Sequence, residues 1–156
     1  MFSVRLDLFH ALNRISLVVK KGHGAFKPFM ARLRDACFVV NRDDVSQASY
    51  YHWSRRRKKN WLFFLRSCRR LVPQPEALLA RFNRVIEEFG GCIDNTSMTR
   101  EVLLRPKAME KVRLLRKHIV AGCLSDPDGV AMYYAVGNNK DGLTRYRCVR
   151  GTNDVE

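Results

Sequence analysis

The fold prediction starts from the stretch Val4-Arg5-Leu6-Asp7-Leu8-Phe9-His10-Ala11-Leu12-Asn13-Arg14-Ile15. Apolar residues alternate up to Leu6, as they do on one face of a buried strand. From Leu8 onward the apolar spacing changes to three and four residues, which predicts a helix reaching about Lys20. Asp7 lies at the junction of the two elements. It can cap the helix, or its carboxylate can lie at the carboxyl end of the strand, where α/β sheets usually bind ligands.

The composition is that of a basic globular protein. The chain has 156 residues, of which 46% are hydrophobic, so it is long enough for one domain with an apolar core. The net charge of +14 arises from 29 Lys and Arg against 15 Asp and Glu. Such an excess predicts an anionic partner, usually nucleic acid; the alternative is a basic protein whose charge merely prevents association.

No membrane partner is expected from the sequence. The first 20 residues lack the continuous apolar core of a secretory signal, and the apolar runs are too short to cross a bilayer. The cysteines are odd in number, widely spaced and without a Cys-x-x-Cys pair, which indicates buried thiols in a reducing compartment. They are Cys37, Cys68, Cys92, Cys123 and Cys148.

The periodicity along the chain predicts a mostly helical α+β fold. Helices are expected over residues 8–20, 26–39, 44–56, 76–89 and 106–121, and the third can extend to residue 71. Residues 92–105 show no period and are predicted as a loop. Two strands are expected at residues 131–136 and 143–149, joined by the turn residues 137–142 as a β-hairpin.

The two ends of the chain carry a pair of short motifs, Asp7-Leu8-Phe9-His10 and Thr152-Asn153-Asp154-Val155-Glu156. In these motifs the chain resembles the DDE-type transposases, whose catalytic domain has an RNase H-like fold. In that family the second catalytic carboxylate follows a strand in an Asp-x-Phe-His phrase. The third is a Glu that opens a helix after a Thr-Asn or Ser-Asn turn. A hairpin just before the third carboxylate departs from the simplest family pattern.

The resemblance implies that residues 1–156 are a single, partial RNase H-like catalytic domain with a helical insertion. Residues 1–20 would supply a strand and a helix of the core. Residues from about 21 to 125 would be the insertion. Residues from about 131 to 156 would form the hairpin and the start of the last core helix.

The resemblance also implies metal-dependent DNA cleavage and strand transfer, with Mg²⁺ or Mn²⁺ as the cofactor of the intact enzyme. Asp7 and Glu156 would then be catalytic metal ligands. His10 would contact a phosphate or a reacting oxygen, the alternative being a helix histidine bonded to local backbone. Asn153 would cap the helix that bears Glu156. The family's first catalytic Asp has no counterpart here, so we expect this chain alone not to cleave DNA.

A basic run, Arg55-Arg56-Arg57-Lys58-Lys59, is the strongest binding signal. Lys and Arg displace counterions from phosphates and give affinity without sequence preference. The run also fits a nuclear import signal, and the two roles can coexist. The neighbouring aromatic residues can stack on unpaired bases or fill a helical core. The other predicted DNA contacts are Arg14, Arg66, Arg69 and Arg70.

Three functional classes fit these patterns. The first is a fragment of a transposase-like enzyme, nuclear in a eukaryote and cytoplasmic otherwise, whose intact form binds DNA and can assemble as a homo-oligomer. The second is a non-catalytic, basic, helical nucleic-acid-binding protein derived from such an enzyme. The third is a protein-interaction module with incidental charge, for which binding to a partner would be insensitive to salt.

Overall fold

The computed structural model describes residues 7–47, 66–95, 98, 100–140 and 142–150. The predicted strand before Asp7, the basic run at 55–59 and the motif at 152–156 lie outside the described residues. The chain divides into two compact units, which we describe separately. Unit 1 comprises Met1–Phe38 and Val72–Ser125, and unit 2 comprises Val39–Leu71 and Asp126–Glu156.

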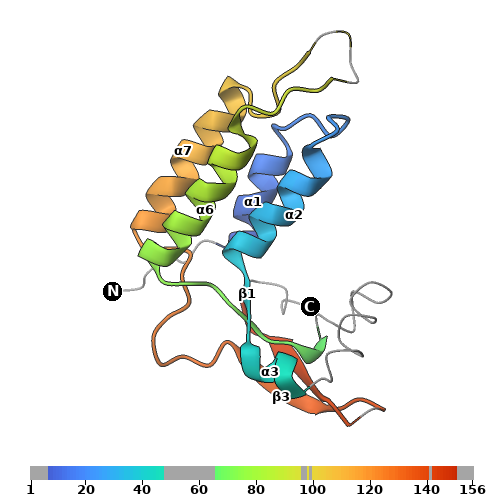
Figure 1. Cartoon of the computed structure of the whole chain (residues 1–156). Coiled ribbons are helices and arrows are strands. Elements are labelled where there is room, and N and C mark those ends of the chain that lie inside the picture. The colour runs from blue at the N-terminus through green and yellow to red at the C-terminus, as the bar shows by residue number, and fades with distance from the viewer. Residues whose placement is uncertain (1–6, 48–65, 96–97, 99, 141, 151–156) are drawn as a thin grey trace. The chain divides into compact units, whose positions relative to one another are not determined.

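Four helices of unit 1 lie side by side and form a bundle (Figure 1). Helix α1 packs against α2 and α7, and α6 packs against the same two helices. The apolar stripe of each helix therefore faces a shared interior, which is the arrangement that the three- and four-residue spacing predicts. Their bounds are α1 (Leu8–Ser16), α2 (Phe26–Cys37), α6 (Pro75–Gly90) and α7 (Pro106–Val120).

The core of unit 1 is a single cluster of buried apolar side chains. Phe29 and Phe89 meet edge to face, with ring centroids 5.4 Å apart. Burial of each such large side chain favours folding by about 1.5–3 kcal/mol. The largest of the fully buried side chains come from all four helices and from the loop before α7: Ile15, Phe29, Leu33, Leu78, Phe82, Leu103, Val112 and Ile119 are under 2% exposed.

Several helix ends of unit 1 have identifiable stabilising features. Asp7 is the N-cap of α1, and its Oδ1 accepts a hydrogen bond from the Phe9 N–H at 2.8 Å. Proline occupies the first turn of α6 and of α7, where its missing N–H has no cost. At the end of α2, Arg81 donates to the carbonyl oxygens of Asp35 and Ala36 at 2.9 and 2.8 Å.

The buried His23 ties two loops of the bundle together. Its Nδ1 accepts from the Ala25 N–H at 3.1 Å, so its Nε2 carries the proton and donates to the Glu101 carbonyl, also at 3.1 Å. The Glu101 carboxylate binds Lys20 and Arg105 at 2.6 Å each. The hydrogen bond from Lys20, helped by Arg105, lowers the pKa of Glu101. His23 is thus a structural residue.

Unit 2 contains two small antiparallel sheets and one short helix. Strand β1 (Val39–Val40) pairs with β2 (Arg70–Leu71), and helix α3 (Arg42–Gln47) follows β1. Strands β3 (Tyr133–Asn138) and β4 (Thr144–Cys148) form the second sheet, which is a hairpin with an irregularity between Ala135 and Gly137.

The predicted α+β class is confirmed, and so is the C-terminal hairpin. Three helix predictions extend too far. The helix expected over 26–39 ends at Cys37, because Val39 and Val40 pair with β2. The extension of the third helix to residue 71 is wrong, because Arg70 and Leu71 form β2; in the described residues that helix covers only α3.

The first helix also ends earlier than expected, at Ser16 rather than near residue 20. It packs on α2 and α7, which the resemblance to the transposases assigns to the insertion. Every strand in the described ranges belongs to a two-stranded antiparallel sheet. Within those ranges, no helix is long and apolar enough to span a bilayer.

Candidate nucleic-acid interface

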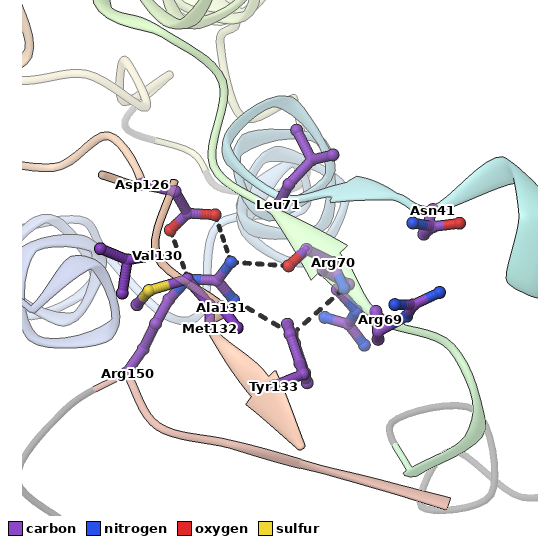
Figure 2. A pocket seen from close by; sticks show the side chains of 10 residues that line it. All are labelled: Asn41, Arg69, Arg70, Leu71, Asp126, Val130, Ala131, Met132, Tyr133 and Arg150. Carbon is purple, nitrogen blue, oxygen red and sulfur yellow. Dashed lines mark hydrogen bonds and ion pairs between the residues drawn. The ribbon is translucent and has the colours of Figure 1, made fainter. Parts of the chain in front are cut away.

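Arg150 joins the parts of unit 2 through all five of its N–H donors. Figure 2 shows the bonds to Asp126, Tyr133 and the Arg70 carbonyl. Its Nε and Nη2 bind the two carboxylate oxygens of Asp126, and Nη2 also donates to the Arg70 carbonyl at 2.7 Å. Its Nη1 donates to the Tyr133 hydroxyl at 3.1 Å and to Cys148 Sγ at 3.6 Å. Because the guanidinium has five donors, none is left for a ligand.

The Arg150 site is charged and largely shielded from water. Burial opposes the charge, but the carboxylate of Asp126 outweighs it, and the pKa of Arg150 is raised. Burial and the neighbouring Cys148 raise the pKa of Tyr133. The Tyr133 oxygen accepts from Arg150 and from the Arg70 N–H, both at 3.1 Å. Arg150 therefore holds β2, β4 and the start of β3 together.

Arg69 makes a second link of the same kind. Its guanidinium binds Asp44 of α3 with a shortest distance of 2.7 Å, and its backbone N–H donates to Asp44 Oδ2 at 2.7 Å. The hydrogen bonds that Arg69 donates to the Asp44 carboxylate raise the pKa of Arg69. The same guanidinium lies 4.6 Å from the ring centroid of Tyr146 on β4, in cation–π contact.

These links divide the hairpin β3–β4 into two different faces. Tyr133, Tyr146 and Cys148 lie on the face that Arg69 and Arg150 hold, which we call the inward face. The opposite, outward face consists of Tyr134, Arg145, Arg147 and Val149. Tyr134 pairs with Arg147 across the strands, and the period of two places Arg145 and Val149 on the same side.

The outward face is exposed. Tyr134 is 45% and Val149 44% exposed, and both arginines are exposed as well. An aromatic ring, an aliphatic side chain and two cations therefore lie on the same face of the hairpin. The alternation Arg145-Tyr146-Arg147 within a predicted strand is the signal in the sequence that could indicate this face.

A small open cavity of about 220 Å³ lies in unit 2. Leu71, Val130, Ala131 and Met132 supply its apolar lining (Figure 2). Its polar lining includes Asp126, Tyr133 and Arg150, which bind one another. We therefore interpret this cavity as a by-product of the Arg150 link.

The predicted DNA contacts of unit 2 have different positions. Arg66 is exposed, in agreement with a surface role. Arg69 is 37% exposed in its side chain but is bound to Asp44. Arg70 is only 6% exposed, because it lies in β2 beneath the Arg150 network, so its burial does not fit the predicted contact with a duplex. The basic run 55–59 lies outside the described residues.

The predicted catalytic residues Asp7 and His10 lie together at the start of α1. Asp7 Oδ2 is 2.8 Å from His10 Nδ1, and the two side chains are 24% and 64% exposed. Arg14 is exposed on the same helix. The capping role of Asp7 is confirmed, while Glu156 and Asn153 lie outside the described residues, so the pairing of Asp7 with Glu156 stays a prediction.

The described residues do not by themselves assemble a metal site. They contain no group of three or more His, Cys, Asp and Glu side chains that could hold an ion. Asp7 supplies one carboxylate, and both of its oxygens already have partners in Phe9 and His10. A two-ion centre needs several oxygen ligands, so we derive no metal-dependent step from this geometry.

Comparison with protein-family models, with curated proteins and with solved structures finds no match to this chain.

Proposed function

We propose that the chain binds nucleic acid and that unit 2 carries the binding surface. The main supporting observation is that two arginines of unit 2 are bound to carboxylates, while other basic side chains of the same unit are exposed. Arg69 and Arg150 are bound to carboxylates, which leaves their charge compensated. The exposed basic side chains of the described part of unit 2 are Arg42, Arg66, Lys140, Arg145 and Arg147.

A surface of this kind suits phosphate. Phosphates are contacted mainly by Arg and Lys, and these contacts supply affinity without reading the sequence. The run Arg55–Lys59 lies between α3 and β2 in the chain and adds five cations to unit 2. The net charge of +14 would also steer the chain towards a polyanion over a long range at low salt.

We propose DNA as the nucleic acid because of the resemblance to the DDE-type transposases. Under that proposal the chain is part of an RNase H-like catalytic domain. In the intact enzyme Asp7 and Glu156 would bind Mg²⁺ or Mn²⁺, with His10 beside them. This part rests on the two sequence motifs alone. A non-catalytic nucleic-acid-binding protein derived from such an enzyme would account equally well for the surface of unit 2.

The dependence of duplex binding on salt tests the proposed function. We expect the chain to bind labelled duplex DNA weakly and without sequence preference. The logarithm of affinity should fall with the logarithm of salt by about 0.9 per phosphate neutralised, between about 50 and 200 mM salt. Replacing Arg55, Arg56 and Arg57 by Ala should flatten this slope, as measured by fluorescence anisotropy.

A matched set of substitutions in unit 1 controls for net charge. Lys107, Arg113 and Lys117 are exposed on α7. Replacing these three by Ala removes the same charge as the change at residues 55–57, but should leave the slope unchanged. Absence of binding at about 50 mM salt, or an affinity that does not respond to salt, would contradict the proposed function.

A further inference from the structure

We propose that the outward face of hairpin β3–β4 is a platform for unpaired bases, so that the chain binds single-stranded nucleic acid in preference to duplex. This inference rests on the proposed nucleic-acid binding and adds the form of nucleic acid that is recognised. Its centre is Tyr134, with Arg145, Arg147 and Val149 around it.

The inward face of the hairpin fixes the direction in which this platform points. Tyr133 is held by Arg150, and Tyr146 is covered by the Arg69 guanidinium. Neighbouring residues of a strand point to opposite faces, so engaging Tyr133 and Tyr146 on one side leaves Tyr134 and Arg145 on the other. The platform is therefore held before any ligand arrives, which lowers the entropic cost of binding.

The exposed apolar area suits base faces better than phosphates. Tyr134 and Val149 are 45% and 44% exposed and lie on the same face as Arg147, which is the cross-strand partner of Tyr134. A phosphate gains nothing from an aromatic ring, whereas an unpaired base can stack on it. In a duplex the base faces are covered by their neighbours, so only a single strand can use Tyr134 in this way.

Arg145 on the outward face can contact the backbone of such a strand, because its side chain is exposed on β4. A guanidinium can donate two parallel hydrogen bonds to one phosphate, so Arg145 can hold a phosphate near the stacked base.

A β-ribbon can also enter the major groove of duplex DNA. Readout there depends on hydrogen bonds to base edges, and the Tyr134 ring and Val149 would face a wet groove with little to contact. The chemistry of this face therefore favours the single strand. The duplex is included in the test as the competing partner.

The test compares labelled oligothymidylate with duplex DNA of equal length, using the full chain and fluorescence anisotropy. Tyr134→Ala should weaken single-strand binding by roughly 5- to 150-fold, the range expected for loss of one stacked base, and should leave duplex binding unchanged. Tyr134→Phe keeps the ring and should bind like the original chain. Arg145→Ala should reduce the single-strand salt slope by about 0.7.

A matched control is Val120→Ala, which truncates an apolar side chain that is 65% exposed on α7. This variant should bind as the original chain does. If Tyr134→Ala binds the single strand normally, or if duplex is preferred, the inference is overturned while the proposed function stands. If neither form binds at low salt, both are overturned.

Discussion

At the scale of single residues, Cys37 shows most clearly how burial changes chemistry. The thiol is fully buried in α2, and burial raises its pKa from 9.0 to about 12. The thiolate is therefore strongly disfavoured in the folded chain. Cys37 should react with thiol reagents only after unit 1 opens, unlike the half-buried Cys92 and Cys123.

The raised pKa of Cys37 also predicts a loss of stability at alkaline pH. Below pH 9 the thiol is protonated in both states, so it adds no pH dependence. From pH 9 towards about 12 the unfolded chain releases the proton and the folded chain keeps it. The free energy of unfolding should then fall by up to about 1.4 kcal/mol per pH unit.

Urea unfolding at several alkaline pH values measures this effect. The Cys37→Ala variant lacks the thiol, so its stability should fall less steeply with pH than that of the original chain. Other groups that titrate in this range are common to both proteins and cancel in the comparison. Parallel pH profiles for the two proteins would contradict the assignment to Cys37.

Residue-scale sequence reasoning succeeded where the partners are close in the chain. Asp7 was predicted as a cap, and its acceptor contact is with the Phe9 N–H two residues away. It failed for Arg150, whose partners Tyr133, Asp126 and Arg70 are 17, 24 and 80 residues distant. No local pattern distinguishes such an arginine from one that binds DNA.

At the scale of elements, the strongly periodic helices were predictable and the short strands were not. Helices α6 and α7 match their predicted ranges closely, because proline opens each of them and their apolar stripes are regular. Strands β1 and β2 have two residues each. They form because Val39 and Val40 pair with Leu71 and Arg70, so a long-range contact overrides the local helical pattern.

The hairpin β3–β4 yields a prediction about the Arg150 link. Arg150→Met keeps much of the side-chain length but removes every donor to Asp126, Tyr133 and the Arg70 carbonyl. Leaving such shielded groups without partners should destabilise unit 2 by about 1–3 kcal/mol. The control is Arg145→Met, an exposed position on the same strand, which should change stability by no more than about 0.5 kcal/mol.

Chemical denaturation followed by the aromatic signal of the hairpin can measure both variants. Equal effects of Arg150→Met and Arg145→Met would show that the buried network contributes nothing beyond an ordinary surface arginine. A larger effect of Arg150→Met would support a structural role for this arginine.

At the scale of the whole molecule, the two units are stabilised by different forces. Every member of the buried apolar cluster belongs to unit 1. In the described part of unit 2, the buried residues are Asp44, Ser67, Cys68 and Arg70. The two sheets of this unit are joined by contacts of Arg69 and Arg150. The composition gave the basic charge and the apolar fraction, but it could not show that the apolar core would gather in unit 1.

This difference predicts that hairpin β3–β4 opens more readily than the helical bundle. Polar links contribute less net free energy than a large buried apolar cluster, because water competes for the same hydrogen bonds. Native-state hydrogen exchange should therefore show lower protection for amides of β3 and β4 than for those of α2 and α6. Local opening of this kind is common in binding elements, which are drawn from the less stable parts of a protein.

Asp126→Asn separates local opening from global unfolding. The variant removes the charge opposite Arg150, so exchange in β4 should accelerate further. The amides of α2 and α6 lie in unit 1, where the apolar cluster is intact, and their exchange should not change. Equal protection of the hairpin and of α6 in the original chain would mean that the arginine links match the apolar core in strength. In that case the outward face of β3–β4 would be as rigid as the bundle, and ligand binding should not increase its protection.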